Sequence, residues 1–143
     1  MDQEKNKKLL VIDGNALVHR AYHALPPLKT KKGKLVNAVY GFLLLLLKAI
    51  KDLKPGYIAA TFDLKGPTFR HEQFKEYKAK RVKAPDELYQ QLDYVKEILR
   101  ALKIPIYEQQ GFEADDVIGT ITCLAKRRQV PQNPSGYFKR RFR

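Results

Sequence analysis

The stretch Gly111-Phe112-Glu113-Ala114-Asp115-Asp116-Val117-Ile118-Gly119 places three carboxylates within four residues. An apolar helical pattern begins directly after the acids, so they crowd the first turn of an expected helix. A helix N-terminus stabilises each acid by only about 0.3–1 kcal/mol, and one or two acids satisfy it. The third acid favours a divalent metal ion bound by carboxylate oxygens. From this stretch alone, helix capping and a metal site both stay open.

Strands and helices are expected to alternate along the chain up to this stretch. The expected strands are short apolar runs at 9–12, 57–62 and 104–107. The expected helices are 16–23, 37–54 and 85–102. This alternation predicts an α/β domain with a parallel sheet and flanking helices, in three layers.

Two of the expected strands end in an aspartate, Asp13 and Asp63. In open parallel sheets ligands bind at the carboxyl edge, so both residues are candidates for a site. Asp13 could instead cap the helix that follows it. No helix start follows Asp63, which favours a functional role for that residue. With the acids after the third strand, these aspartates should meet at one edge of the sheet.

The formal net charge of the 143 residues is +13, and its distribution is uneven. After Asp116 the chain carries seven basic residues and no acid. A basic surface implies a polyanionic partner, most simply nucleic acid, bound in a salt-dependent manner. A metal site inside such a surface suits a protein that cleaves phosphodiester bonds.

A basic insertion at 65–83 follows Asp63 and lacks the broad apolar stripe of a packed helix. Its cations alternate with aromatic residues, a composition suited to single-stranded nucleic acid, where rings stack on bases. A solvated surface loop is the alternative interpretation. The basic loop 29–34 also has two interpretations of equal weight, phosphate contact and a solvated surface loop.

The length indicates a single domain, and no apolar run is long enough to cross a membrane. No signal peptide is expected, which predicts a cytoplasmic, nucleoid-associated protein. The single cysteine, Cys123, excludes an internal disulfide. Residues 1–122 are expected to form the domain, and residues 123–143 a basic, disordered tail.

Several motifs together resemble one family. They are Leu9-Leu10-Val11-Ile12-Asp13-Gly14-Asn15, Asn37-Ala38-Val39-Tyr40-Gly41-Phe42, Phe62-Asp63, Thr68-Phe69-Arg70-His71 with Tyr77-Lys78, and Glu113-Ala114-Asp115-Asp116-Val117-Ile118. This set is similar to the N-terminal 5′-3′ exonuclease domain of bacterial DNA polymerases I, within the flap endonuclease family. The resemblance covers about residues 8–122. It implies a PIN-like fold with a helical arch and structure-specific cleavage of DNA at 5′ flaps or nicks.

The resemblance also implies roles for individual residues. Metal-binding acids would be Asp13, Asp63, Glu113, Asp115 and Asp116, holding two Mg²⁺ or Mn²⁺ ions. Lys78 and Arg81 would be catalytic, beside the reacting phosphate. DNA-binding residues of the arch would be Arg70, Tyr77, Lys78, Arg81 and Lys83.

In the family more acids follow this region, whereas this sequence has none after Asp116. The resemblance therefore implies a truncated domain with an incomplete second metal position and impaired activity. A separate polymerase is a conceivable partner, and the oligomeric state is open.

Three other functions compete with this one. A small PIN-type ribonuclease shares the acids but would normally lack so long a basic insertion. A non-catalytic DNA-binding fragment would bind DNA without a metal. A Rossmann-like nucleotide-binding domain is disfavoured, because Asp13-Gly14-Asn15 is no glycine-rich phosphate loop.

Overall fold

The sheet of the computed structural model, which describes residues 8–80 and 82–127, has three parallel strands in the order β1-β2-β3. Strand β1 (Leu9–Asp13) lies in register with β2 (Tyr57–Thr61), so that Asp13 faces Thr61. Strand β3 (Ile106–Tyr107) pairs with the other edge of β2. The predicted parallel α/β sheet is confirmed.

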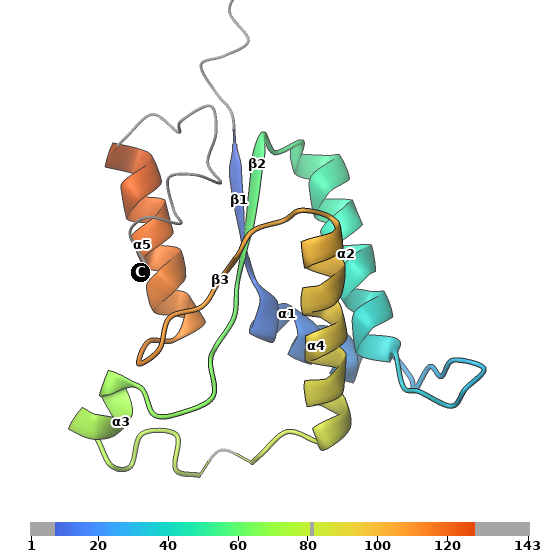
Figure 1. The fold of residues 1–143 in the computed structure, drawn as a ribbon, viewed down its shortest axis with the longest axis horizontal. Coiled ribbons are helices and arrows are strands. Elements are labelled where there is room, and N and C mark those ends of the chain that lie inside the picture. Colours follow the sequence, from blue (N-terminus) through green and yellow to red (C-terminus); the bar gives the residue numbers. More distant parts are fainter. Residues whose placement is uncertain (1–7, 81, 128–143) are drawn as a thin grey trace, which may run out of the picture.

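Helices cover both faces of the sheet (Figure 1). On one face lie α1 (Gly14–Ala24), α2 (Asn37–Leu53) and α4 (Asp86–Ala101), and on the other lies α5 (Ala114–Arg127). The three-layer arrangement agrees with the sequence prediction.

The core lies between β1, β2 and the face formed by α1, α2 and α4. Phe42 and Leu46 of α2 are almost fully buried there, as are Val95 and Leu99 of α4. These positions recur every three to four residues, which is the spacing of one face of a helix. The packing fixes the strands, and with them the carboxyl edge of the sheet.

Helix α5 extends beyond the predicted domain end. It runs through Cys123 to Arg127, so the first residues assigned to the tail are helical. The physical reason is the apolar spacing, because Val117 and Ile121 are buried and Leu124 continues the same face. The remainder of the predicted tail, 128–143, lies outside the described residues.

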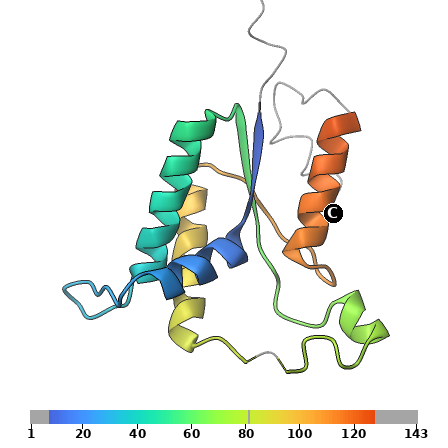
Figure 2. The same ribbon diagram turned by 180° about the vertical axis from the view of Figure 1, so that it is seen from behind.

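The basic insertion connects β2 to α4 along the carboxyl edge of the sheet (Figures 1 and 2). Among the described residues between β2 and α4, α3 (Phe69–Gln73) is the only helix. On the opposite side of the fold, the loop between α1 and α2 forms a small hairpin closed by a bridge between Lys29 and Leu35. No helix in the described part of the chain is long and apolar enough to span a membrane.

A buried glutamine of α4 caps α2. Gln91 is fully buried, and its Oε1 accepts the backbone N–H groups of Ala38 at 2.8 Å and Val39 at 3.3 Å. Its Nε2 donates to Oδ1 of Asn37 at 3.2 Å. The residue before α2, Val36, provides no side-chain cap. Gln91 therefore satisfies the free N–H groups that a helix N-terminus leaves.

Replacing Gln91 with leucine is expected to lower the free energy of unfolding by about 1–3 kcal/mol. The change leaves buried N–H groups of α2 without an acceptor, and a buried donor without a partner carries its full desolvation penalty. Urea denaturation followed by circular dichroism measures the loss. The matched control is Gln90→Leu, because Gln90 is the exposed neighbour on the same helix; equal losses in both variants would contradict the capping role.

Candidate functional site

A cleft of about 960 Å³ lies at the carboxyl edge of the sheet. Four of the five predicted metal-binding acids line it: Asp13, Asp63, Glu113 and Asp115. The insertion contributes Lys78 and Lys83, and the opposite wall carries side chains of α4. The structure thus brings residues far apart in the sequence to one site.

Asp13 has two roles. Its Oδ1 accepts the backbone N–H of Ala16 at 2.9 Å, so it caps α1 as the alternative interpretation supposed. It also lies beside two other carboxylates. Burial raises the pKa of the Asp13 carboxyl, and so do repulsion from Asp115 and Asp63 and a side-chain hydrogen bond with Asp115. Asp13, Asp63 and Asp115 therefore line the same cleft, and Asp13 feels the negative charge of both other acids.

Asp63 also caps a helix, although no helix begins directly after it in the sequence. Its Oδ1 accepts the backbone N–H of Ala114, the first residue of α5, at 2.7 Å. The premise that Asp63 has no helix to cap was wrong, because the capped helix begins 51 residues later. The bond fixes the start of α5 against the end of β2, which carries the acids of α5 to the cleft.

Asn15 joins the two aspartate-bearing strands and was not among the predicted site residues. Its Oδ1 accepts the backbone N–H of Asp63 at 3.1 Å. It follows Asp13 by two residues and lines the same cleft. Its place beside the first aspartate was the available signal for this role.

Glu113 is neutralised by the insertion. Its carboxylate accepts hydrogen bonds from Nζ of Lys78 at 2.7 Å and from the hydroxyl of Tyr77 at 3.2 Å. Burial acts to raise the pKa of Glu113, but the hydrogen bonds from Lys78 and Tyr77 and the positive charges of Lys78 and Arg70 together outweigh burial, and the pKa is lowered. Burial acts to lower the pKa of Lys78, but the hydrogen bond to Glu113, the charge of that carboxylate and the contact with Tyr77 together outweigh burial, and the pKa is raised. Both groups are therefore charged at neutral pH.

Asp116 is held by Arg70. Nη1 and Nη2 of Arg70 each lie 2.7 Å from a different carboxylate oxygen of Asp116, which is a bidentate pair. The hydrogen bond from Arg70 lowers the pKa of Asp116, and the same bond raises the pKa of Arg70. The described lining of the cleft includes Asp115 but does not include Asp116.

The five acids thus fall into two sets. Within residues 8–80 and 82–127, no lysine or arginine forms an ion pair with Asp13, Asp63 or Asp115, whereas Glu113 and Asp116 are paired. No group of three or more His, Cys, Asp or Glu side chains in the described part of the chain has metal-binding geometry. Even so, burial and the neighbouring carboxylates raise the pKa of Asp13, and carboxylate oxygens fit a hard divalent cation that would relieve the repulsion.

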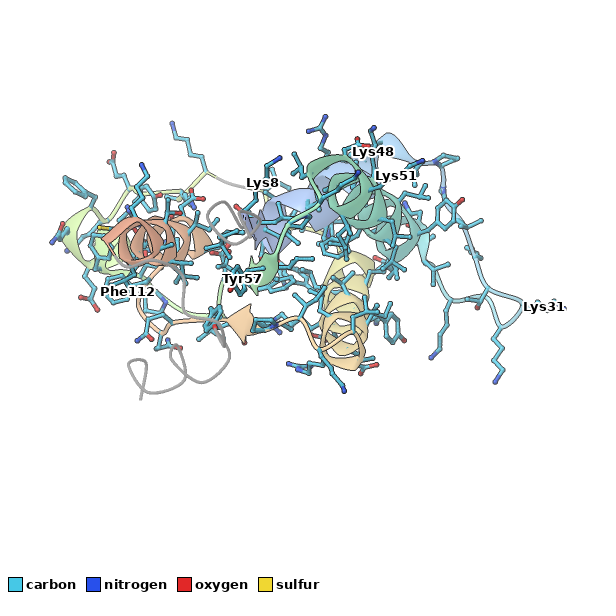
Figure 3. All side chains as sticks on the ribbon, turned by 90° about the horizontal axis from the view of Figure 1, so that it is seen from above. Lys8, Lys31, Lys48, Lys51, Tyr57 and Phe112 are labelled. Atoms are coloured by element: carbon cyan, nitrogen blue, oxygen red, sulfur yellow. The ribbon has the colours of Figure 1, made fainter. Side chains whose placement is uncertain are left out.

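The other predicted site residues lie in different places. Lys83 lines the cleft and is 3.8 Å from Asp86 in an exposed pair. Arg81 lies outside the described residues. Lys31 lies at the far end of the α1–α2 hairpin and points away from the fold (Figure 3). Lys96 was missed: it lines the cleft, pairs with Glu108 at 2.5 Å and lies over the ring of Phe62.

A family model described as the 5′-3′ exonuclease N-terminal resolvase-like domain matches residues 8–132. The chain belongs to this family. DNA polymerase I of Bacillus subtilis is 46% identical over 123 residues, which are 86% of this chain and 14% of the relative. DNA polymerase I of Mycobacterium tuberculosis H37Rv is 46% identical over 120 residues, 82% of this chain and 13% of the relative. The chain therefore spans about one seventh of the curated relatives it matches.

Solved structures with the same fold come from bacteriophage T5. A T5 protein co-crystallised with metal ions has a TM-score of 0.64 and 20% identity, covering 85% of this chain and 44% of that chain. T5 5′-exonuclease with bound zinc has a TM-score of 0.57 and 21% identity, covering 85% and 45%. At such identities the similarity shows the fold, and it confirms the predicted PIN-like α/β arrangement.

In a metal-free buffer, Asp13→Asn is expected to raise the thermal unfolding midpoint at pH 7. Between the ordinary aspartate value of 3.8 and the raised native pKa, the folded chain binds more protons than the unfolded chain. Stability therefore falls as pH rises through this window, and the penalty persists at neutral pH. Asparagine removes the charge and still caps α1.

The thermal unfolding midpoints are to be measured in EDTA at pH 7 and at pH 3.5. At pH 3.5 the gain in midpoint from Asp13→Asn should vanish. Asp52→Asn, in an exposed pair with Lys48 on α2, is the control. With Mn²⁺ the sign should reverse, because the parent chain alone gains the binding energy of the metal. An Asp13→Asn chain that is less stable than the parent in EDTA at pH 7 would contradict the repulsion.

Proposed function

We propose that this domain is a metal-dependent 5′-3′ exonuclease and flap endonuclease that hydrolyses DNA phosphodiester bonds at 5′ flaps or nicks. One observation carries the proposal: three carboxylates not paired with a described lysine or arginine, Asp13, Asp63 and Asp115, meet at the carboxyl edge beside the amino group of Lys78. Family membership supports the same reaction.

Asp13, Asp63, Glu113 and Asp115 would hold Mg²⁺ or Mn²⁺. The family pattern also includes Asp116, whose carboxylate is paired with Arg70. These acids offer only oxygen ligands, which favours hard ions over softer metals. When bound, the cation supplies Lewis-acid stabilisation of the phosphoryl oxygens and lowers the pKa of a water nucleophile. Solved T5 structures with the same fold were crystallised with metal ions, in one case zinc.

The residues of the insertion bind and orient the DNA. Lys78 lines the cleft and carries its charge at neutral pH, so it can neutralise a phosphate once it leaves Glu113. Arg81 is proposed for the same role. Tyr77 offers a ring for base stacking, and Lys83, with Arg70, adds phosphate contacts along the path of a single strand. A T5 flap endonuclease of this fold has been crystallised in a complex with DNA and metal ions.

Cleavage by these 143 residues alone is proposed to be slow. No acid follows Asp116, so a second metal ion finds few carboxylates that are not already used. Replication and repair are the proposed setting, because the matched relatives are DNA polymerases I and so carry a polymerase.

The test is cleavage of a labelled 5′-flap duplex by the purified chain in Mg²⁺, in Mn²⁺ and in EDTA. Cleavage that requires the metal and falls near the flap junction is the expected result. An RNA flap and a plain single strand serve as comparison substrates. Preference for the RNA flap would replace the proposal with a ribonuclease, and binding without cleavage under every condition would refute the nuclease.

Pairing of Glu113 with Lys78 and of Asp116 with Arg70 favours a second candidate, a non-catalytic DNA-binding module. In that case the cations of the insertion neutralise the acids permanently. Such a module binds the flap equally well in EDTA, with affinity falling steeply as salt rises.

A further inference from the structure

We infer that Asp116 is a positioning residue that anchors the insertion to α5, and that it does not bind the metal ion. This inference rests on the proposed function, because it separates Asp116 from the acids assigned to the cation. Its basis is that Asp116 bonds to the guanidinium of Arg70 and that neither of these two residues is among those that line the cleft.

Both carboxylate oxygens of Asp116 already accept hydrogen bonds. Oδ1 and Oδ2 each accept a 2.7 Å hydrogen bond from Arg70, and Oδ2 also accepts the backbone N–H of Glu113 at 3.0 Å. A metal ion would have to displace a bidentate guanidinium, the strongest type of side-chain ion pair. Asp115, its neighbour, lines the cleft and lies beside Asp13.

The Arg70–Asp116 pair belongs to a larger attachment of α3 to the segment before α5. The backbone N–H of Phe69 donates to the carbonyl of Gly111 at 3.0 Å. The rings of Phe69 and Phe112 lie 5.6 Å apart, and the guanidinium of Arg70 lies 4.5 Å from the centre of the Phe69 ring. Backbone, aromatic and ionic contacts thus fix one end of the insertion.

Fixing α3 in this way determines where Lys78 lies. After α3, consecutive turns carry the chain from Phe74 to Ala79, with Tyr77 N–H bonded to the carbonyl of Phe74 and Ala79 N–H to that of Glu76. Lys78 itself has the left-handed φ of 57°, and this turn aims its amino group at the cleft. Asp116 acts on the reaction through Lys78, and a loosened α3 would displace that amino group.

The test compares Asp116→Asn with Asp115→Asn by two measurements that need no turnover. Mn²⁺ affinity is measured by electron paramagnetic resonance, and amide hydrogen exchange is measured at Phe74, Tyr77 and Ala79. We expect Asp116→Asn to keep Mn²⁺ affinity within threefold of the parent and to speed exchange at these amides at least tenfold. Asp115→Asn should weaken Mn²⁺ binding and leave exchange at these amides unchanged.

Arg70→Lys keeps the charge but cannot form the bidentate pair, so it should also speed exchange, and the double variant with Asp116→Asn should add nothing. Asp52→Asn, on the far side of the fold, is the control. Exchange in β1 and β2 reports whether each variant is folded. A parent chain that binds no Mn²⁺ would refute the proposed function. The hydrogen-exchange measurements would still decide whether Asp116 anchors the insertion.

If Asp116 only stabilised the fold, the effect of Asp116→Asn on turnover would not depend on Lys78. Turnover in Mn²⁺, measured with and without Lys78, therefore provides a further readout. In a Lys78→Met background, Asp116→Asn should change turnover less than twofold, although it lowers turnover at least tenfold in the parent. Restored exchange protection in the swapped pair Arg70→Asp with Asp116→Arg would also support the anchor. The inference is overturned if Asp116→Asn weakens Mn²⁺ binding as much as Asp115→Asn while exchange in the insertion stays unchanged.

Discussion

Asp115→Asn is expected to lower the rate of metal-dependent flap cleavage by about 10³-fold, which corresponds to about 4 kcal/mol of transition-state stabilisation. Asp115 lines the cleft beside Asp13, and no described lysine or arginine forms an ion pair with it. Asparagine keeps the size and one oxygen but removes the charge that a divalent cation needs.

Affinity for the flap should stay within about threefold of the parent, because phosphates are bound by cations and not by carboxylates. The measurements are single-turnover cleavage in Mg²⁺ and fluorescence anisotropy with the same labelled flap in EDTA. Asp93→Asn removes one negative charge from the α4 wall of the same cleft and serves as the control. A similar loss in both variants would assign the effect to cleft charge in general, and full activity of Asp115→Asn would exclude Asp115 as a ligand.

The strands and the edge of the site could be predicted from the sequence because both depend on local patterns. The runs at β1 and β2 are apolar because both faces of the sheet are covered, and each is followed by an aspartate. Parallel pairing then brings Asp13 and Thr61 into register, which places Asp63 close by. Nothing beyond strand period and sheet geometry is needed for that step.

Partners that come from distant parts of the chain could not be predicted in this way. Asp63 caps a helix 51 residues away, and Arg70 pairs with an acid 46 residues away. Gln91 caps α2 from another helix, a role that no nearby residue indicates. Capping rules consider only residues that are adjacent in the sequence, so they find the cap formed by Asp13 and miss those formed by Asp63 and Gln91. The division of the acids between cation pairs and the cleft is therefore a property of the tertiary structure.

Lys78→Met is expected to slow flap cleavage by about 10²-fold and at the same time to strengthen binding of Mn²⁺. The slower reaction follows from the loss of a positive charge where negative charge develops on the phosphate. Tighter metal binding follows because Lys78 competes with the cation for Glu113, whose carboxylate it holds at 2.7 Å. Methionine keeps the length of the side chain without its charge.

These opposite effects distinguish two roles for Lys78. If it only held Glu113 in place, its removal would weaken metal binding and slow cleavage together. If it acts on the phosphate, the metal binds more tightly while turnover falls, and Lys78→Arg, which keeps the charge, recovers part of the rate. Because the pKa of Lys78 is raised above 10.5, its charge persists from neutral pH up to that value, so turnover by the parent should show no loss from this group there. Lys48→Met, in an exposed pair on α2, controls for the loss of one surface charge.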